Sequence, residues 1–125
     1  MMNEDFFYML GLDVDSEAAS AETFVAPSSV QKAAKRALGW MADGEAGKGF
    51  TDVGRKRASM LAHGQPVSLV TVRRMFSYFS RHVHDRDAVG FRLGEDGFPS
   101  PGRVAWDAWG GDPGFSWVKG ILRSK

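Results

Sequence analysis

Apolar side chains recur at helical spacing through most of the chain after residue 27. In the first such stretch, lysine and arginine occupy the opposite face and the apolar positions are Val30, Ala33, Ala34, Ala37, Leu38 and Met41. Steps of three and four residues place these positions on one side of a helix. The pattern predicts a helix over about 28–43, which Ser28 or Ser29 caps and Gly44 ends.

Two more helices are predicted after a glycine-rich loop. The first begins at a cap formed by Thr51 or Asp52 and ends before Gly64. Ser68 caps the second helix, whose apolar face consists of Leu69, Val72, Met75, Phe76 and Phe79.

Turn-forming residues dominate the segment from residue 85 to 100, which is predicted to be a long loop. Two helices follow it, at about 101–109 and 113–122. Each begins where a capping residue, Ser100 or Asp112, precedes a proline. Because no stretch of useful length alternates between apolar and polar residues, no strand is predicted.

Together these elements predict an all-α fold. It is a single compact domain of about five short helices at residues 28–125, preceded by an extended acidic N-terminal arm and linker at residues 1–27. A chain of 125 residues has room for one core. No apolar run is long enough to span a bilayer, so no membrane partner is expected. The predicted core includes Val30, Leu38, Leu61, Val72, Phe76, Phe79, Trp106, Trp109 and Val118.

Charge is distributed unevenly along the chain. The net charge is +1, yet the first 26 residues contain six acidic side chains and no Lys or Arg. The other 99 residues hold all 16 basic side chains and the nine acidic ones that are left of 15, a charge of +7. This asymmetry indicates contact of the basic body with a polyanion, or an acidic arm that folds back on the body or docks on a basic partner.

The arm carries an apolar cluster formed by Phe6, Phe7, Met9, Leu10 and Leu12. In one interpretation it is a docking peptide for another subunit, because adjacent phenylalanines cannot both face one shallow groove unless a second surface covers them. In the other, the terminus frays and its phenylalanines rest on the domain.

Residues 55–79 have the outline of a helix-turn-helix: a helix, a short glycine-containing turn and a second helix with basic residues in its first two turns. In that arrangement, basic side chains neutralise phosphates. The nucleic-acid contacts predicted on this hypothesis are Arg55, Lys56, Arg57, Thr71, Arg73 and Arg74. The alternative is a helix pair that only closes the core, with its arginines in solvent.

Signals for catalysis and for cofactors are weak. The stretch at residues 44–50 differs from a phosphate-binding P-loop because Gly follows Lys48 where Ser or Thr is required, and because a helix precedes it. His82 and His84 are two residues apart and do not share a helical face, so a metal site with Asp85 or Asp87 is disfavoured. With no Cys and no nucleophile–base pair, we expect no catalytic residues, no metal site, no cofactor and no enzyme activity.

Three of the four tryptophans lie within twelve residues. Trp106 and Trp109 share a helical face, and small residues flank them, as in close helix–helix contacts. A platform for stacking nucleic-acid bases requires exposed rings alternating with cations. The pattern therefore favours core packing against Trp40, with Gly110 and Gly111 ending the helix.

Three segments resemble a small helical domain that is common in tailed-phage genomes. They are "VQKAAKRALGW", "VGRKRASMLAHGQPVSLVTVRRMFSYFSRH" and "GFPSPGRVAWDAWGGDPGFSWVKGI", which together cover roughly residues 28–122. That domain occurs alone or attached to larger proteins, some of them similar to head-maturation proteases. The resemblance implies a phage or prophage source and assigns no catalytic activity or functional residues.

Three functional hypotheses follow. The first is a non-enzymatic virion component, such as a capsid-associated, decoration or minor head protein, that docks through its arm onto a larger phage structural protein. The second is a DNA-binding module that acts through residues 55–79, and the third is an inhibitor of a host protein. The expected location is the phage particle or the host cytoplasm.

Overall fold

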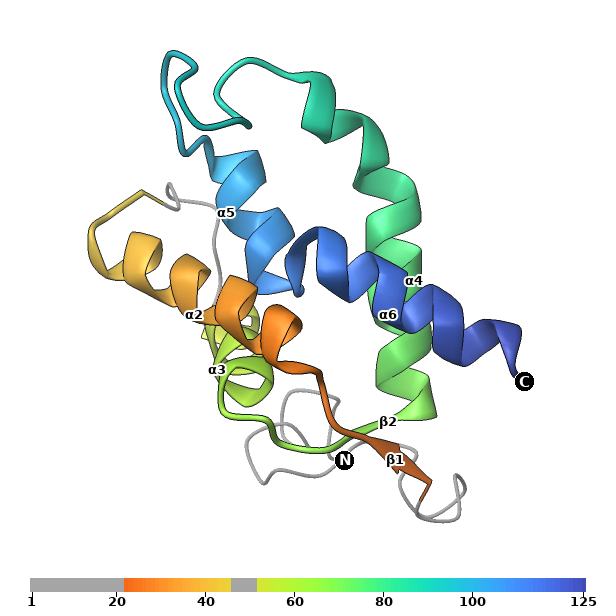
Figure 1. Cartoon of the computed structure of the whole chain (residues 1–125). Helices are drawn as coiled ribbons and strands as arrows, with labels where there is room; N and C mark the ends of the chain where they lie inside the picture. The colour runs from red at the N-terminus through yellow and green to blue at the C-terminus, as the bar shows by residue number, and fades with distance from the viewer. Residues whose placement is uncertain (1–21, 46–51) are drawn as a thin grey trace, which may run out of the picture.

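The computed structural model describes residues 22–45 and 52–125, and within these ranges the chain is predominantly helical (Figure 1). The helices are α2 (Ser28–Ala42), α3 (Asp52–Ala62), α4 (Leu69–His82), α5 (Pro101–Ala108) and α6 (Gly111–Arg123), and the 3₁₀ helix η1 (Val83–Asp87) extends α4. Two short strands, β1 (Thr23–Phe24) and β2 (Val67–Ser68), complete the described elements. The predicted all-α class is confirmed.

Helix α2 is the centre of the arrangement, because α3, α5 and α6 all pack against it. Helix α4 packs mainly on α6, which crosses it in Figure 1. Strand β1 pairs antiparallel with β2, with Thr23 opposite Ser68 and Phe24 opposite Val67. The sequence predicts no strand here because a two-residue pairing is too short to produce an alternating pattern. The pairing ties the segment before α2 to the segment before α4.

Two of the predicted helix caps are confirmed. The Ser68 hydroxyl accepts a hydrogen bond from the Thr71 backbone N–H at 3.2 Å. The Ser100 hydroxyl accepts one from the Arg103 N–H at 3.1 Å, and a proline occupies the first turn of α5. Both bonds satisfy an amide that has no partner within its own helix.

The predicted serine cap of α2 is wrong. Pro27 is the N-cap residue and makes no side-chain capping bond; its carbonyl accepts from the N–H groups of Val30 and Gln31, each at 3.0 Å. Ser28 and Ser29 are the first two residues of the helix, because Pro27, with its extended backbone, occupies the N-cap position.

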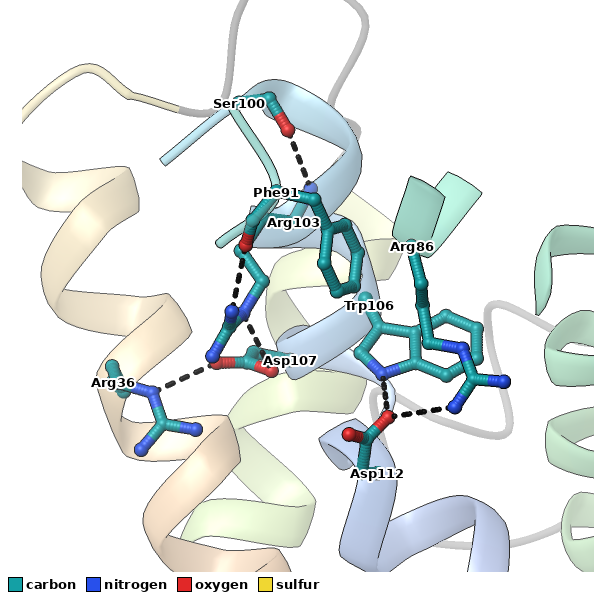
Figure 2. Close-up of polar contacts among 8 residues, drawn as sticks. All are labelled: Arg36, Arg86, Phe91, Ser100, Arg103, Trp106, Asp107 and Asp112. Atoms are coloured by element: carbon teal, nitrogen blue, oxygen red, sulfur yellow. Dashed lines mark hydrogen bonds and ion pairs between the residues drawn. The ribbon is translucent and has the colours of Figure 1, made fainter. Parts of the chain in front are cut away.

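The α5–α6 corner is tighter than predicted. Gly110 and Gly111 both have positive φ, 119° and 69°, and α6 starts at Gly111 rather than at residue 113. Asp112 is therefore in the first turn of α6 and is not its cap, which corrects the predicted Asp112 boundary. Its carboxylate accepts a hydrogen bond from the Trp106 indole N–H at 2.9 Å and lies 3.5 Å from Arg86 (Figure 2).

Most of the predicted core is buried. Full burial is observed for Val30, Leu61, Val72, Phe79, Trp106 and Val118. Leu38 and Trp109 are partly buried and pack against this cluster. The prediction for Phe76 is wrong, since it is 36% exposed. Helix α4 buries the face of Val72, Met75 and Phe79, and Phe76 lies at the edge of that stripe, tilted against Phe115.

A buried carboxylate joins three parts of the fold. Asp107 of α5 is 1% exposed and contacts Arg36 of α2 at 2.8 Å and Arg103 at 3.4 Å (Figure 2). Arg103 in turn donates to the Phe91 carbonyl at 2.7 Å, which fixes the loop between η1 and α5 to the helix that follows it. These two cations compensate the charge of Asp107, since a buried carboxylate without a partner is strongly destabilising.

Candidate anion-binding site

The exposed side of α4 carries Arg74, Ser77 and Arg81. Steps of three and four residues place them in one row along the helix. Together with Arg57 of α3 and Trp109 at the end of α5, they line an open pocket of about 440 Å³. Residues from α3, α4 and the C-terminal end of α5 thus contribute to one surface depression.

The charge of this pocket has one sign. Among residues 22–45 and 52–125, the charged residues that line it are Arg57, Arg74 and Arg81, and no carboxylate from these ranges is among them. A guanidinium is permanently protonated and presents N–H donors in a planar fork that matches phosphate and carboxylate oxygens. The pocket therefore has the composition of a site for an anion that brings several oxygen acceptors.

Aromatic rings connect the pocket to the core. The Arg57 guanidinium carbon lies 4.6 Å from the centre of the Trp109 ring. Trp109 is stacked on Tyr78, with ring centres 4.6 Å apart and an interplanar angle of 8°. Tyr78 also stacks on His82 at 4.6 Å. These contacts form a continuous stack, called here the aromatic column. Its members, in order, are Arg57, Trp109, Tyr78 and His82.

Tyr78 is the buried member of this column. Burial raises the pKa of its hydroxyl well above the ordinary value, and the negative charges of Asp85 and Asp107 raise it further. The phenol is therefore neutral at physiological pH. At the far end of the column, His82 lies 2.9 Å from the Asp85 carboxylate, measured from its Nδ1 atom.

Only part of the predicted nucleic-acid contact set belongs to the pocket. Arg57 and Arg74 line it, whereas Arg55, Lys56 and Arg73 are exposed outside it. Arg55 lies 3.3 Å from Asp52 of its own helix.

The inclusion of Thr71 in that set is wrong. Its side chain belongs to the buried face of α4, one turn before Met75, and Thr71 is 2% exposed. A residue in the first turn of α4 is not automatically on its outer side, because the helix is buried along one face over its whole length.

Sequence reasoning missed Ser77, Arg81 and Trp109. The sequence pattern assigns Trp109 to the core and does not single out Ser77 or Arg81 as a site residue. The spacing from Arg74 through Ser77 to Arg81 is the signal that could have identified the row. Nothing in the local sequence connects this row to Arg57 or Trp109, since tertiary packing alone brings them together.

The packing of α3 and α4 differs from a helix-turn-helix. In that motif two consecutive helices pack across a short turn. Here α3 packs mainly on α2 and α5, α4 packs mainly on α6, and the connection between them contains strand β2. The arginines of the two helices nevertheless meet at the pocket.

The remaining predictions concern the arm, the glycine-rich stretch, a metal site and a membrane span. The apolar arm residues Phe6, Phe7, Met9, Leu10 and Leu12 fall outside the described residues, as do residues 46–50 of the glycine-rich stretch, which include Gly47, Lys48 and Gly49. Within residues 22–45 and 52–125, no three His, Asp or Glu side chains are grouped as a metal site would require. In the same ranges, none of the helices has both the length and the apolar character needed to cross a membrane.

The fold and the pocket define a small helical domain with an open, arginine-lined pocket. Comparisons of the chain with models of protein families, with curated proteins and with solved structures found no match.

Proposed function

We propose that this chain is a non-enzymatic binding domain that holds a nucleic-acid backbone against Arg57, Arg74 and Arg81. The observation that carries the proposal is the convergence of three arginines from α3 and α4 on one open pocket, to whose lining the described part of the chain contributes no acidic residue. Phosphate groups match this donor set in charge and in geometry.

The surroundings of the pocket support a polyanion over a single small anion. Lys56 and Arg73 are exposed on the same two helices, outside the pocket. A continuous phosphate backbone can contact such residues while one phosphate occupies the pocket. Neutralising several phosphates releases counterions, so the affinity should fall steeply as salt is added.

The proposal is tested by the binding of a fluorescent DNA duplex, measured by anisotropy at several salt concentrations. The variant Arg74→Ala/Arg81→Ala removes two pocket arginines. Lys32→Ala/Lys35→Ala is its control with the same change in net charge, at exposed positions of α2 outside the pocket lining. We expect the pocket variant to bind at least about tenfold more weakly and to reduce the slope of log K against log [salt] by about two. The control should lose much less affinity.

Two results would overturn the proposal. One is the absence of binding by the intact chain at low salt. The other is an equal loss of affinity in the two double variants, because the pocket would then contribute nothing beyond net charge.

A second candidate is a virion component that docks through its arm onto a larger phage structural protein. It is favoured by the resemblance to a tailed-phage domain and by the apolar cluster around Phe6 and Phe7. Deleting residues 1–12 should leave the unfolding transition of the domain unchanged and abolish co-sedimentation with assembled particles. Retention of the truncated chain on particles would contradict this candidate.

A further inference from the structure

We infer that Trp109 is a positioning residue that holds Arg57 ready to bind the anion. The inference rests on the proposed function, and it assigns to a tryptophan on α5 a role in a pocket that α3 and α4 form. Its basis is the contact of the Arg57 guanidinium with the Trp109 ring at 4.6 Å.

The pocket needs such a link because its arginines come from helices with different packing partners. Arg74 and Arg81 share α4, so the geometry of one helix fixes their spacing. Arg57 is on α3, which packs mainly on α2 and α5. Trp109 contacts both α3 and α4, since its ring faces the Arg57 guanidinium of α3 and is stacked on Tyr78 of α4.

Trp109 is itself well fixed. It is the C-cap residue of α5, where its backbone N–H bonds to the carbonyl of Ala105 at 3.2 Å, and it is partly buried against the core. Its stacking partner Tyr78 is buried and is also in edge contact with Phe79. The indole is therefore an extension of the core that reaches the pocket.

A ring is a suitable support for an arginine that has to bind an anion. The cation–π attraction acts on the face of the guanidinium, whereas its N–H donors point outward in the plane. Support from the ring therefore does not itself use the N–H donors of the guanidinium. A free arginine side chain loses rotamer freedom when it binds, and a side chain held in place beforehand loses less.

The test is a double-mutant cycle on the affinity for the same DNA duplex, using the full chain. Arg57→Ala and Trp109→Leu are measured singly and together, and Trp109→Phe keeps an aromatic face. We expect W109L to weaken binding about three- to tenfold, because immobilising one arginine side chain carries a cost of that order. The double variant should bind no more weakly than R57A alone, and W109F should bind within about threefold of the original chain.

A purely structural role predicts a different result. W109L would then lower the urea midpoint of unfolding and leave the dissociation constant of the folded chain unchanged, or its effect would add in full to that of R57A. Either result overturns the inference. Trp40→Leu is the matched control, because Trp40 packs on Phe98 outside the pocket and its loss should not alter binding.

Two further conditions keep the outcome decisive. If W109L does not fold, the cycle is run with Trp109→Met, which fills space adaptably and has no ring. If the original chain binds no duplex, the proposed function fails; if it binds and R57A weakens binding while W109L does not, only the role of Trp109 fails.

Discussion

At the scale of single residues, Tyr78 is where the core and the arginine pocket meet. Its ring stacks on Trp109 and on His82, and its hydroxyl is buried. A buried phenol is stable while it is neutral, but ionisation would place a negative charge in a poorly solvated position near Asp85 and Asp107. This environment makes the native state sensitive to alkaline pH.

We predict that Tyr78→Phe reduces the loss of stability at high pH. In the folded chain the pKa of the Tyr78 hydroxyl is raised above its ordinary value of 10.0. Below pH 10 this hydroxyl is therefore protonated in both the native and the unfolded chain. Above it the unfolded chain releases the proton and the native chain keeps it, so the free energy of unfolding falls as pH rises. Urea unfolding at several pH values between about 8 and 11 should show a shallower decline for Y78F.

Tyr8→Phe is the control for this experiment, because Tyr8 is the other tyrosine of the chain. Its stability profile should follow that of the original chain. Parallel curves for Y78F and the original chain would show that the Tyr78 hydroxyl does not affect alkaline stability.

At the scale of elements, the α5–α6 corner depends on a close approach that only glycine permits. Gly111 has a φ of +69°, and a Cβ placed there would lie 3.0 Å from the Ala33 Cβ and 3.0 Å from an Asp107 carboxylate oxygen. Both neighbours belong to the contact between α5, α6 and α2. The corner therefore sets the position of the Asp107 carboxylate as well as the start of α6.

We predict that Gly111→Ala lowers the free energy of unfolding by about 2 kcal/mol or more, from the combined strain of a positive φ and of overpacking. Gly120→Ala is the matched control in the same helix, because a Cβ at Gly120 would meet no atom within 4 Å. It should raise stability by about 0.5–1 kcal/mol through better helix propensity. Urea unfolding measures both changes, and equal behaviour of the two variants would contradict the argument.

The elements also show where sequence reasoning succeeds and where it stops. Helices α4 and α5 were predicted with their caps, because a serine cap and a regular apolar stripe are local signals. The start of α6 was misplaced because Asp112 resembles a cap, although its carboxylate is used by the Trp106 indole. Of the five described lining residues, the sequence predicts Arg57 and Arg74 as contact residues. It does not predict Trp109, since the contact of Trp109 with Arg57 joins residues 52 positions apart.

At the scale of the whole molecule, charge separation sets how strongly the domain attracts a polyanion at a distance. The first 26 residues carry a charge of −6 and the following residues +7, so the long-range attraction of a basic body is nearly cancelled in the intact chain. This cancellation acts through the net charge, so it is expected at low salt and should disappear when ions screen the protein.

We therefore predict that neutralising Glu4, Asp5, Asp13, Asp15 and Glu17 with the corresponding amides strengthens duplex binding in a salt-dependent way. The five substitutions raise the formal net charge from +1 to +6 and leave Arg57, Arg74 and Arg81 in place. Affinity should rise at least about threefold at roughly 50 mM salt, and the gain should vanish near roughly 300 mM, where the screening length is well under 10 Å. A gain in affinity that persists at high salt would instead indicate that these carboxylates compete with the nucleic acid by direct contact. The absence of a gain at low salt would show that the pocket arginines, and not the net charge, determine the affinity.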